Sequence, residues 1–250
     1  MKGKHFCLIF ILMVFTGIIF SQDAEDLIAK ADEMFLQMSD METANKALDL
    51  YRQALGKTED KYQAFWRISR IHYFIGTHLD EKKEKQATFA QGVYYGKKAV
   101  EAEPEKPDGH YWLAVNNGKY GETKGVMKSL SLVKPIKQSL NKVLELDRTY
   151  EDGGADRVLG RVFFKLPGIA GGSKDKSMEH LEKSKELGPD DPVTRVYLAE
   201  TYLAKDKIEE ARAELEFVLN MDPDPRWVVG FEHARQDAEE LLKDKKFRKE

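Results

Sequence analysis

Two aromatic-rich segments carry the side chains best suited to hold a ligand. The first lies within residues 62–74 and the second within residues 110–120. Aromatic rings joined by a few polar tips are typical of a largely apolar pocket that orients its ligand through few contacts. The alternative is that the rings form core and that the polar tips have protein partners. The candidate binding residues on these segments are Trp66, His72, Tyr73, Tyr111, Trp112, Asn116 and Asn117.

A pair of arginines further along the chain suggests how such a ligand would be held. Arg157 and Arg161 are four residues apart and therefore share one helix face, with Phe164 close behind them. Two guanidinium forks on one face can hold a carboxylate between them. The pair therefore predicts a site that holds a carboxylate group. The alternative is that both arginines pair with acids such as Asp156 or Glu151.

Motifs that would indicate catalysis are missing from the sequence. There is no His-Glu-x-x-His, no Gly-x-Ser-x-Gly and no phosphate-binding glycine loop. Ser173 follows two glycines but is interpreted as the N-cap of a helix over residues 174–187. The sole cysteine is Cys7, and the histidines show no ligand spacing with acids. We expect no enzyme, no catalytic residues, no metal site and no cofactor.

The candidate residues must be positioned by helices, because an interval of twelve residues recurs along the chain. A small residue precedes a proline by twelve in Gly92…Pro104, Ser177…Pro189 and Ala211…Pro223. Small residues let two antiparallel helices approach, and the proline ends the second helix. The pattern predicts an all-α, tetratricopeptide-like right-handed solenoid of about five helix pairs. The segment Phe231–Lys243 is expected to be its capping helix.

The repeats differ in length, and the difference indicates where insertions lie. The turn markers at Glu59, Pro104, Arg148, Pro189 and Pro223 are 45, 44, 41 and 34 residues apart, and 34 is the ordinary length. We expect the extra residues in the turns within helix pairs, clustered on one rim. The turn Leu166–Gly172 should border one pocket together with the aromatic helices. The alternative is tolerated variation of surface loops.

The N-terminus is typical of an export signal. Lys2, Lys4 and His5 precede an apolar run from Phe6 to Phe20, which suits a secretory signal over residues 1–21. Residues 22–250 then form the repeat domain, periplasmic or secreted; an uncleaved anchor is the alternative. Cys7 lies at the start of the apolar run and not after it, so we expect no lipoprotein.

The charge of the remaining chain argues against two classes of partner. Without residues 1–21 the formal net charge is −5, with acidic and basic residues mixed along the sequence. A surface of this kind does not favour nucleic acid or an anionic membrane as a partner.

Three stretches of the sequence resemble a known family. They are YQAFWRISRIHYFIG, GVYYGKKAVEAEPEKPDGHYWLAVNNGKYGE and GGADRVLGRVFFKLPGIAGGSKDKSMEHLEKSKEL. Together they look like the T component of tripartite ATP-independent periplasmic (TRAP) transporters, the TatT family, over roughly residues 24–223. The eukaryotic regulators of microtubule dynamics are similar over the same kind of repeats. Export and the Leu-Pro-Gly…Gly-Gly loop favour the bacterial family.

The resemblance implies a partner as well as a fold. It implies a periplasmic helical-repeat protein that associates with the solute-binding protein of a transporter and handles a hydrophobic or organic-acid ligand. Homo-oligomers are compatible with it. A general exported repeat scaffold for another protein partner is the alternative.

Overall fold

The computed structural model describes residues 23–38, 40–224 and 230–248, and all regular structure within them is helical. A first helix covers residues 23–36. The helices that follow are α2 (Met41–Lys57), α3 (Tyr62–His78), α4 (Lys82–Ala102), α5 (Pro107–Lys124), α6 (Val126–Leu146), α7 (Tyr150–Lys165), η1 (Gly168–Ala170), α8 (Lys174–Leu187), α9 (Pro192–Ala204), α10 (Ile208–Asn220), α11 (Phe231–Leu241) and η3 (Lys245–Arg248).

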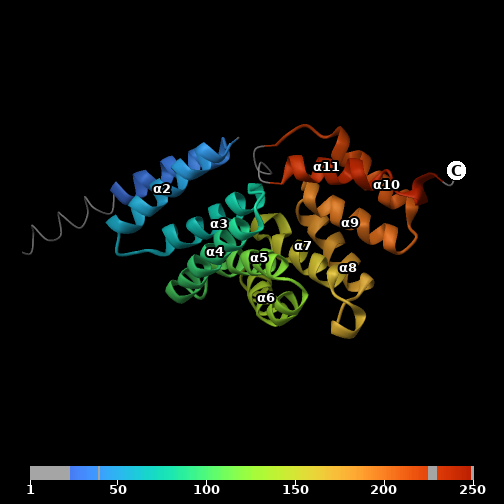
Figure 1. Cartoon of the computed structure of the whole chain (residues 1–250), viewed down its shortest axis with the longest axis horizontal. Helices are drawn as coiled ribbons and strands as arrows, with labels where there is room; N and C mark the ends of the chain where they lie inside the picture. The colour runs from blue at the N-terminus through green and yellow to red at the C-terminus, as the bar shows by residue number, and fades with distance from the viewer. Residues whose placement is uncertain (1–22, 39, 225–229, 249–250) are drawn as a thin grey trace, which may run out of the picture.

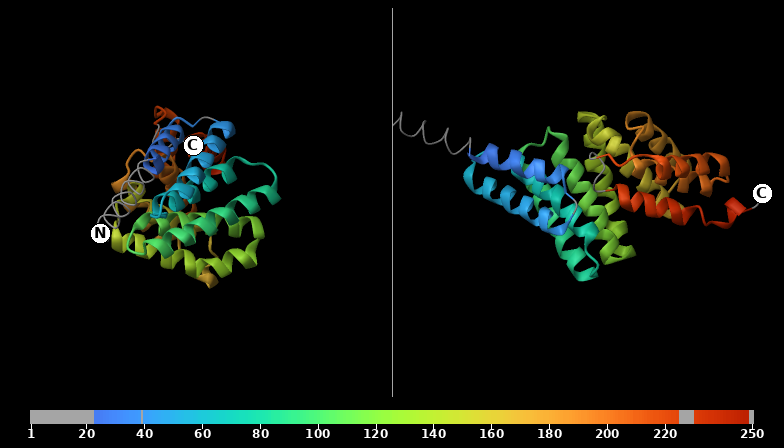
Figure 2. Two further views of the ribbon diagram at one scale, coloured as in Figure 1. Left: turned by 90° about the vertical axis from the view of Figure 1, so that its left-hand side faces the viewer. Right: turned by 90° about the horizontal axis from the view of Figure 1, so that it is seen from above.

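The helices stack as five antiparallel pairs with α11 added at the end. Each helix packs on its neighbour in sequence. The first helix of each pair, called a first helix below, also contacts the first helix of the next pair: α3 contacts α5, α5 contacts α7, and α7 contacts α9. The array curves, so that α2 and α11 lie on the same side of the central helices α5 and α6 (Figures 1 and 2). The predicted fold class is confirmed, and the inner side of the curve is formed by first helices.

The helix ends follow the turn markers read from the sequence. Helices α4, α8 and α10 end at Ala102, Leu187 and Asn220, in each case before the expected proline. Asp40 caps α2 by accepting a hydrogen bond from the backbone N–H of Thr43 at 2.7 Å. These local signals set the repeat boundaries before any tertiary contact is considered.

Small residues lie at the crossings within helix pairs, as predicted. Ala199 and Ala211 are fully buried where α9 meets α10. At the α7–α8 crossing, a Cβ added to Gly160 would lie 2.5 Å from Cγ of Leu181 and 3.1 Å from the carbonyl oxygen of Ser177. The helices therefore pack too closely there for any side chain larger than hydrogen at position 160.

The predicted insertions do not form long turns. Only three residues separate α3 from α4, and only Gly125 separates α5 from α6. The extra residues instead lengthen α4, α5 and α6 to 21, 18 and 21 residues, against 13 each in α9 and α10. The prediction of clustered loops was wrong here because segments such as KKEKQATFAQ consist mostly of strong helix formers. The expected turn forms only between α7 and α8.

The C-terminal helix has the polar outer face that a cap requires. Phe231, Ala234 and Ala238 of α11 are buried against the array, whereas most of its other residues are exposed. The predicted span Phe231–Lys243 is two residues longer than the observed helix. The export signal predicted for residues 1–21 lies outside the described residues. Within the described part of the chain, no helix has both the length and the apolarity needed to cross a membrane.

Candidate functional site

The inner side of the array encloses a cavity of about 1090 Å³. Its walls come from the first helices α3, α5, α7 and α9 and from the start of α6, with Phe35 and Leu36 at one end. The apolar part of the lining is Tyr73, Tyr111, Trp112, Val115, Val126, Leu130, Val133, Ile136, Val158, Val162, Val193 and Tyr197. A cavity of this size and lining is typical of a site for an apolar ligand or an inserted side chain.

Six of the ten candidate residues line this cavity, and four do not. Those in the lining are Tyr73, Tyr111, Trp112, Asn117, Arg157 and Arg161. Those that face elsewhere are Trp66, His72, Asn116 and Phe164. The sequence therefore correctly predicted that residues from three repeats lie close together. It did not distinguish the side chains on the inner face of each helix from those packed against neighbouring helices.

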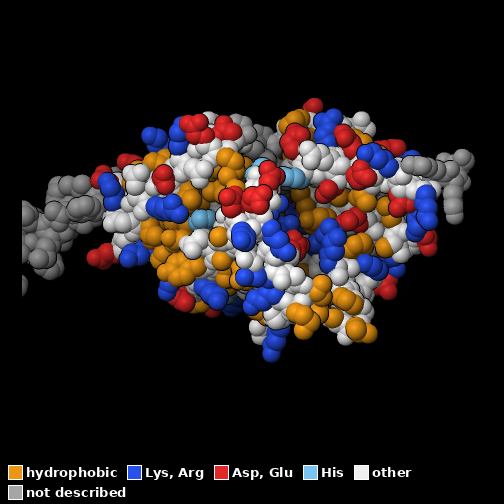
Figure 3. All heavy atoms as spheres, viewed as in Figure 1, with side chains coloured by type: hydrophobic (Ala, Val, Ile, Leu, Met, Phe, Trp, Pro, Cys, Tyr) orange, Lys and Arg blue, Asp and Glu red, His pale blue; other side chains and the backbone are white. Residues whose placement is uncertain are grey.

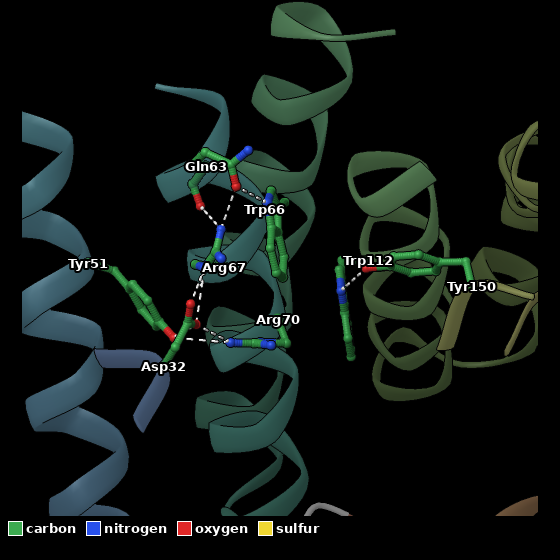
Figure 4. A network of polar contacts seen from close by, with 8 residues as sticks. All are labelled: Asp32, Tyr51, Gln63, Trp66, Arg67, Arg70, Trp112 and Tyr150. Carbon is green, nitrogen blue, oxygen red and sulfur yellow. Dashed lines mark hydrogen bonds and ion pairs between the residues drawn. The ribbon is translucent and has the colours of Figure 1, made fainter. Parts of the chain in front are cut away.

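Three rings form the aromatic wall of the cavity: Tyr73, Tyr111 and Trp112. The Trp112 ring lies 5.9 Å from that of Tyr73 and 5.0 Å, edge-on, from that of Tyr111. The indole N–H of Trp112 donates to the hydroxyl of Tyr150 at 3.2 Å (Figure 4). Because the polar tip has a partner, the indole ring is fixed in orientation while one side contributes to the cavity.

The arginine pair does not form a free carboxylate clamp. Arg157 donates to Asp191 and, at 2.7 Å, to the hydroxyl of Tyr111, while Arg161 pairs with Glu200. Both arginines pair with acids, as the alternative interpretation expected, but not with Asp156 or Glu151. The acids are Asp191, at the start of α9, and Glu200, further along the same helix. Because each guanidinium already has a carboxylate, the sequence argument for an organic-acid ligand loses its basis.

The acid Asp156, suggested as a partner of the arginines, has other partners. Its carboxylate accepts from Arg148 at 2.8 and 3.1 Å and contacts the ring of His180 at 2.7 Å. Burial by itself would raise the pKa of Asp156, but the bonds from His180 and Arg148 outweigh it and hold that pKa below its usual value. Asp156 therefore ties α7 to α8, away from the cavity.

Asn116 and His72 belong to the packing between helices. The amide of Asn116 donates to the carbonyl of Ser69 at 3.0 Å and to that of Trp112 at 2.9 Å, and a Cβ on Gly92 would overlap its side-chain oxygen. His72 is buried beside the ring of Tyr95, and neither ring nitrogen has a hydrogen-bond partner among the described residues. Burial, with a smaller effect from a nearby arginine, lowers the pKa of His72 to about 4, so the ring is neutral.

The rings of Trp66 and Phe164 do not line the cavity, and each ring is covered by cationic side chains. The guanidinium of Arg67 lies 4.1 Å from the centre of the Trp66 ring, and that of Arg70 lies 5.0 Å away. Both arginines donate to Asp32, which joins the first helix to α3 (Figure 4). The Phe164 ring lies under the ammonium of Lys174 at 3.3 Å. Cation–π contacts therefore account for both rings without a ligand.

The turn between α7 and α8 reaches the cavity at its beginning only. Leu166 and Pro167 line the cavity, as predicted for this turn, but residues 168–172 do not. Ile169, on η1, is fully exposed. Ser173 accepts a hydrogen bond from the backbone N–H of Lys176 at 3.2 Å, which confirms it as the N-cap of α8.

Sequence reasoning missed a left-handed segment in the cavity wall. Glu151, Asp152 and Gly153 at the start of α7 have φ values of 52°, 52° and 78°. For a residue other than glycine this conformation costs roughly 1–2 kcal/mol. Glu151 and Asp152 both line the cavity. The Asp-Gly-Gly run at 152–154 was a visible signal for an irregular backbone there, although not for its location in the wall.

A histidine pair joins α3 to the C-terminal helix α11. The rings of His78, at the end of α3, and His233, on α11, lie 5.1 Å apart. A second cavity of about 490 Å³ adjoins this contact. Among the described residues, no cluster of three or more His, Cys, Asp or Glu side chains is arranged to bind a metal.

We expect acid to weaken the contact between His78 and His233. Burial, followed by the proximity of His78, lowers the pKa of His233, with Lys119 and Lys85 adding to this effect and Asp237 opposing it. A folded pKa below the unfolded one means that the neutral ring stabilises the fold at neutral pH, and that this stability is lost as the pH falls below about 6.5. Thermal melts between pH 7.5 and 5.5 should show a steeper fall in Tm for the wild type than for His233→Gln. Parallel curves would contradict the prediction.

The face of the molecule shown in Figure 3 carries charges of both signs. On the face shown in Figure 3, acidic and basic side chains are interspersed over most of the helices, and neither sign forms a large uninterrupted patch. The mixture agrees with the small net charge of the sequence.

The stacked helix pairs and the cavity on their inner side define a tetratricopeptide-like helical repeat protein. Solved structures of this class superpose on the chain. TTC0263, a TPR protein of Thermus thermophilus, gives a TM-score of 0.63 at 18% identity, over 84% of this chain and 98% of that one. PilF of Pseudomonas aeruginosa gives 0.52 at 13% identity, over 88% and 92%. At these identities the likeness shows the fold alone.

The chain belongs to the family of the regulators of microtubule dynamics proteins 1–3, whose family model matches residues 27–166. Regulator of microtubule dynamics protein 3 of Rattus norvegicus is 24% identical over 238 residues, which cover 88% of this chain and 50% of the relative. The chain thus spans about half the length of this curated relative. This is the second of the two families that the repeats resemble; membership of the T-component family stays a proposal.

Proposed function

We propose that the protein is an interaction scaffold that receives an apolar group of its partner in the inner cavity. The observation that carries this proposal is the aromatic wall of Tyr73, Tyr111 and Trp112, which two successive repeats contribute to a cavity of about 1090 Å³. Buried aromatic residues of this kind commonly supply most of the binding energy at protein interfaces. The surrounding ion pairs hold the wall in place before a partner arrives.

The finer proposal names the partner and its compartment. We propose that residues 1–21 direct the chain out of the cytoplasm and that the partner is the solute-binding protein of a TRAP-type transporter. The motifs from Gly109 to Leu113 and from Leu166 to Gly172 support it, because both lie at or next to the cavity. Cell fractionation tests the compartment, and retention in the cytoplasm would contradict it.

Trp112→Ala is expected to reduce capture of the solute-binding protein by about tenfold or more, since truncating a central aromatic typically costs at least about 2 kcal/mol of binding. Purified protein is immobilised and the captured partner is measured at several concentrations. Phe164→Ala is the matched control, because that ring lies outside the cavity under Lys174. Equal capture by wild type and Trp112→Ala would place the binding surface elsewhere.

A second candidate function comes from the family. The matched family model and the rat relative both carry regulation of microtubule dynamics in their names, which makes tubulin an alternative partner of the same cavity. Co-sedimentation with polymerised microtubules separates the two. Pelleting that Trp112→Ala abolishes would favour tubulin, and absence of pelleting together with capture of the solute-binding protein would favour the transporter role.

A further inference from the structure

One carboxylate in the cavity wall has no hydrogen-bond or ion-pair partner among the described residues. Glu151 lines the cavity, and no hydrogen bond or ion pair joins its side chain to another described residue. Burial raises the pKa of Glu151, and the nearby guanidiniums of Arg157 and Arg70 only partly offset this. A carboxylate that the fold leaves unpaired in a partly closed cavity is unusual, because burying an unpaired charge is costly.

The cations of the cavity compensate the charge of Glu151 only in part, since they form ion pairs with other acids. Arg157 pairs with Asp191 and Arg161 with Glu200, as described above. The guanidinium of Arg70 donates to Asp32 at 2.8 Å.

The two remaining cations of the cavity lining, Lys119 and Lys165, do not pair with Glu151 either. Lys119 lies 3.5 Å from Glu122, and Lys165 is an exposed residue whose ammonium lies over the Phe164 ring at 5.8 Å. Among the described residues, these cations therefore leave the carboxylate of Glu151 without an ion pair.

Glu151 lies beside the aromatic wall of the cavity. A Cβ added to Gly154 would lie 2.9 Å from Cβ of Glu151, and the charge of Glu151 helps to raise the pKa of Tyr111 and of Tyr150. A Cβ added to Gly154 would lie 2.8 Å from the Tyr111 ring, so the backbone that carries Glu151 runs directly against the aromatic wall. A carboxylate beside several aromatic rings is the combination that binds ammonium and guanidinium groups, because both the charge and the ring faces attract a cation.

The backbone conformation supports a functional role for this side chain. Glu151 and Asp152 are held in the left-handed region although neither is glycine. Strained residues of this kind cluster at ligand sites, where the surrounding fold enforces them. Here the enforcement is visible, because Gly188 lies so close that a Cβ on it would meet the carbonyl oxygen of Asp152 at 2.7 Å.

We propose that the cavity is a site for an organic cation, whose ammonium or guanidinium group binds Glu151 while its apolar body lies against Tyr111 and Trp112. This rests on the proposed function and specifies the chemistry of the group that enters the cavity. It replaces the organic acid expected from the arginine pair. A lysine or arginine side chain of the partner and a free amine share this chemistry.

Calorimetric titration with three probes of similar shape tests the proposal: 2-phenylethylamine, 2-phenylethanol and 3-phenylpropionate. The wild-type protein should bind the amine about tenfold or more tightly than the alcohol or the acid, the size expected of a charged hydrogen bond. Glu151→Gln should remove this preference and leave binding of the alcohol unchanged. Glu145→Gln, the same change on an exposed residue of α6, should behave as wild type.

Two peptides identify the source of the cation. Acetyl-Phe-Lys-Phe-amide and its norleucine analogue differ only in the ammonium group. Preference for the lysine peptide supports a partner side chain as the occupant, and binding of the amine without either peptide supports a free amine.

The outcomes separate the cation site from the scaffold function. Tighter binding of the acid, or unchanged amine affinity in Glu151→Gln, would overturn the cation site. If Trp112→Ala still abolished partner capture in that case, the scaffold function would stand and only the assigned ligand chemistry would fall.

Discussion

Replacement of Asp191 by alanine is expected to lower the free energy of unfolding by about 3–5 kcal/mol, the range found when one partner of a buried ion pair is removed. Asp191 is fully buried and has two roles. It accepts from Arg157, and it caps α9 through the backbone N–H of Val193 at 2.9 Å and the hydroxyl of Thr194 at 2.5 Å. Alanine would leave Arg157 without its acid and α9 without its cap. Urea unfolding followed by circular dichroism measures the loss.

Two further variants show which role dominates. Asp191→Asn keeps an oxygen for the cap but removes the charge, so its loss should be intermediate. Asp175→Ala removes an exposed acid from the first turn of α8, where it contacts only the surface Lys205, and should cost no more than about 1 kcal/mol. A loss below about 1 kcal/mol for Asp191→Ala would mean that Arg157 finds another acid; Glu151 is the nearest candidate in the cavity wall.

The repeat boundaries could be predicted because they are set by local chemistry. A proline generally stops the helix before it, although Pro135 lies inside α6, and a small residue is needed where two helices cross closely. Pro104, Pro189 and Pro223 therefore marked helix ends, and Ala199 and Ala211 marked a crossing, without knowledge of the tertiary structure. The register of the array followed from these few positions.

The insertions could not be placed because length alone does not distinguish a longer helix from a longer turn. The residues before Gly92 and those around Gly125 favour helix, so the extra residues extended helices that were already present. Helix propensity summed over each segment was the missing criterion. Leu166–Gly172, with its proline and four small residues, was the one insertion whose composition opposes a helix.

The partners of the arginines could not be predicted because they come from another repeat. Arg157 and Arg161 share a face of α7, which is readable from their spacing, but Asp191 and Glu200 are more than thirty residues away on α9. Only the stacking of first helices brings the two faces together. A search for acids on the adjacent first helix, rather than within the same helix, would have found both.

The same ion pairs connect stability with binding. Arg157, on α7, joins Asp191 at the start of α9 to Tyr111 of α5, so one guanidinium connects three consecutive helices of the cavity wall. A wall held in this way undergoes little ordering when a ligand arrives, which favours affinity. It also leaves Glu151 without a hydrogen bond or ion pair among the described residues, because the guanidinium of Arg157 is already engaged by Asp191 and Tyr111.

Gly160→Leu is expected to lower the free energy of unfolding by about 1–3 kcal/mol, the usual cost of overpacking a filled core. A Cβ at this position already lies 2.5 Å from Cγ of Leu181, and the remaining atoms of leucine would extend into the α7–α8 crossing. The helices must separate or Leu181 must leave its place. Thermal and urea unfolding measure the effect, and Ala211→Leu at the fully buried α9–α10 crossing should behave alike.

Gly56→Leu is the matched control, because the same change near the end of α2 meets nothing within 4 Å and exchanges a poor helix former for a good one. It should be neutral or stabilising by up to about 1 kcal/mol. Ser177→Ala at the α7–α8 crossing removes only a hydrogen bond to Thr201, whose hydroxyl keeps a second bond to the carbonyl of Tyr197 at 2.9 Å; the loss should stay near 1 kcal/mol. If Gly160→Leu were as stable as Gly56→Leu, close approach of α7 and α8 would not be what the small residue provides, and the twelve-residue interval would need another physical cause.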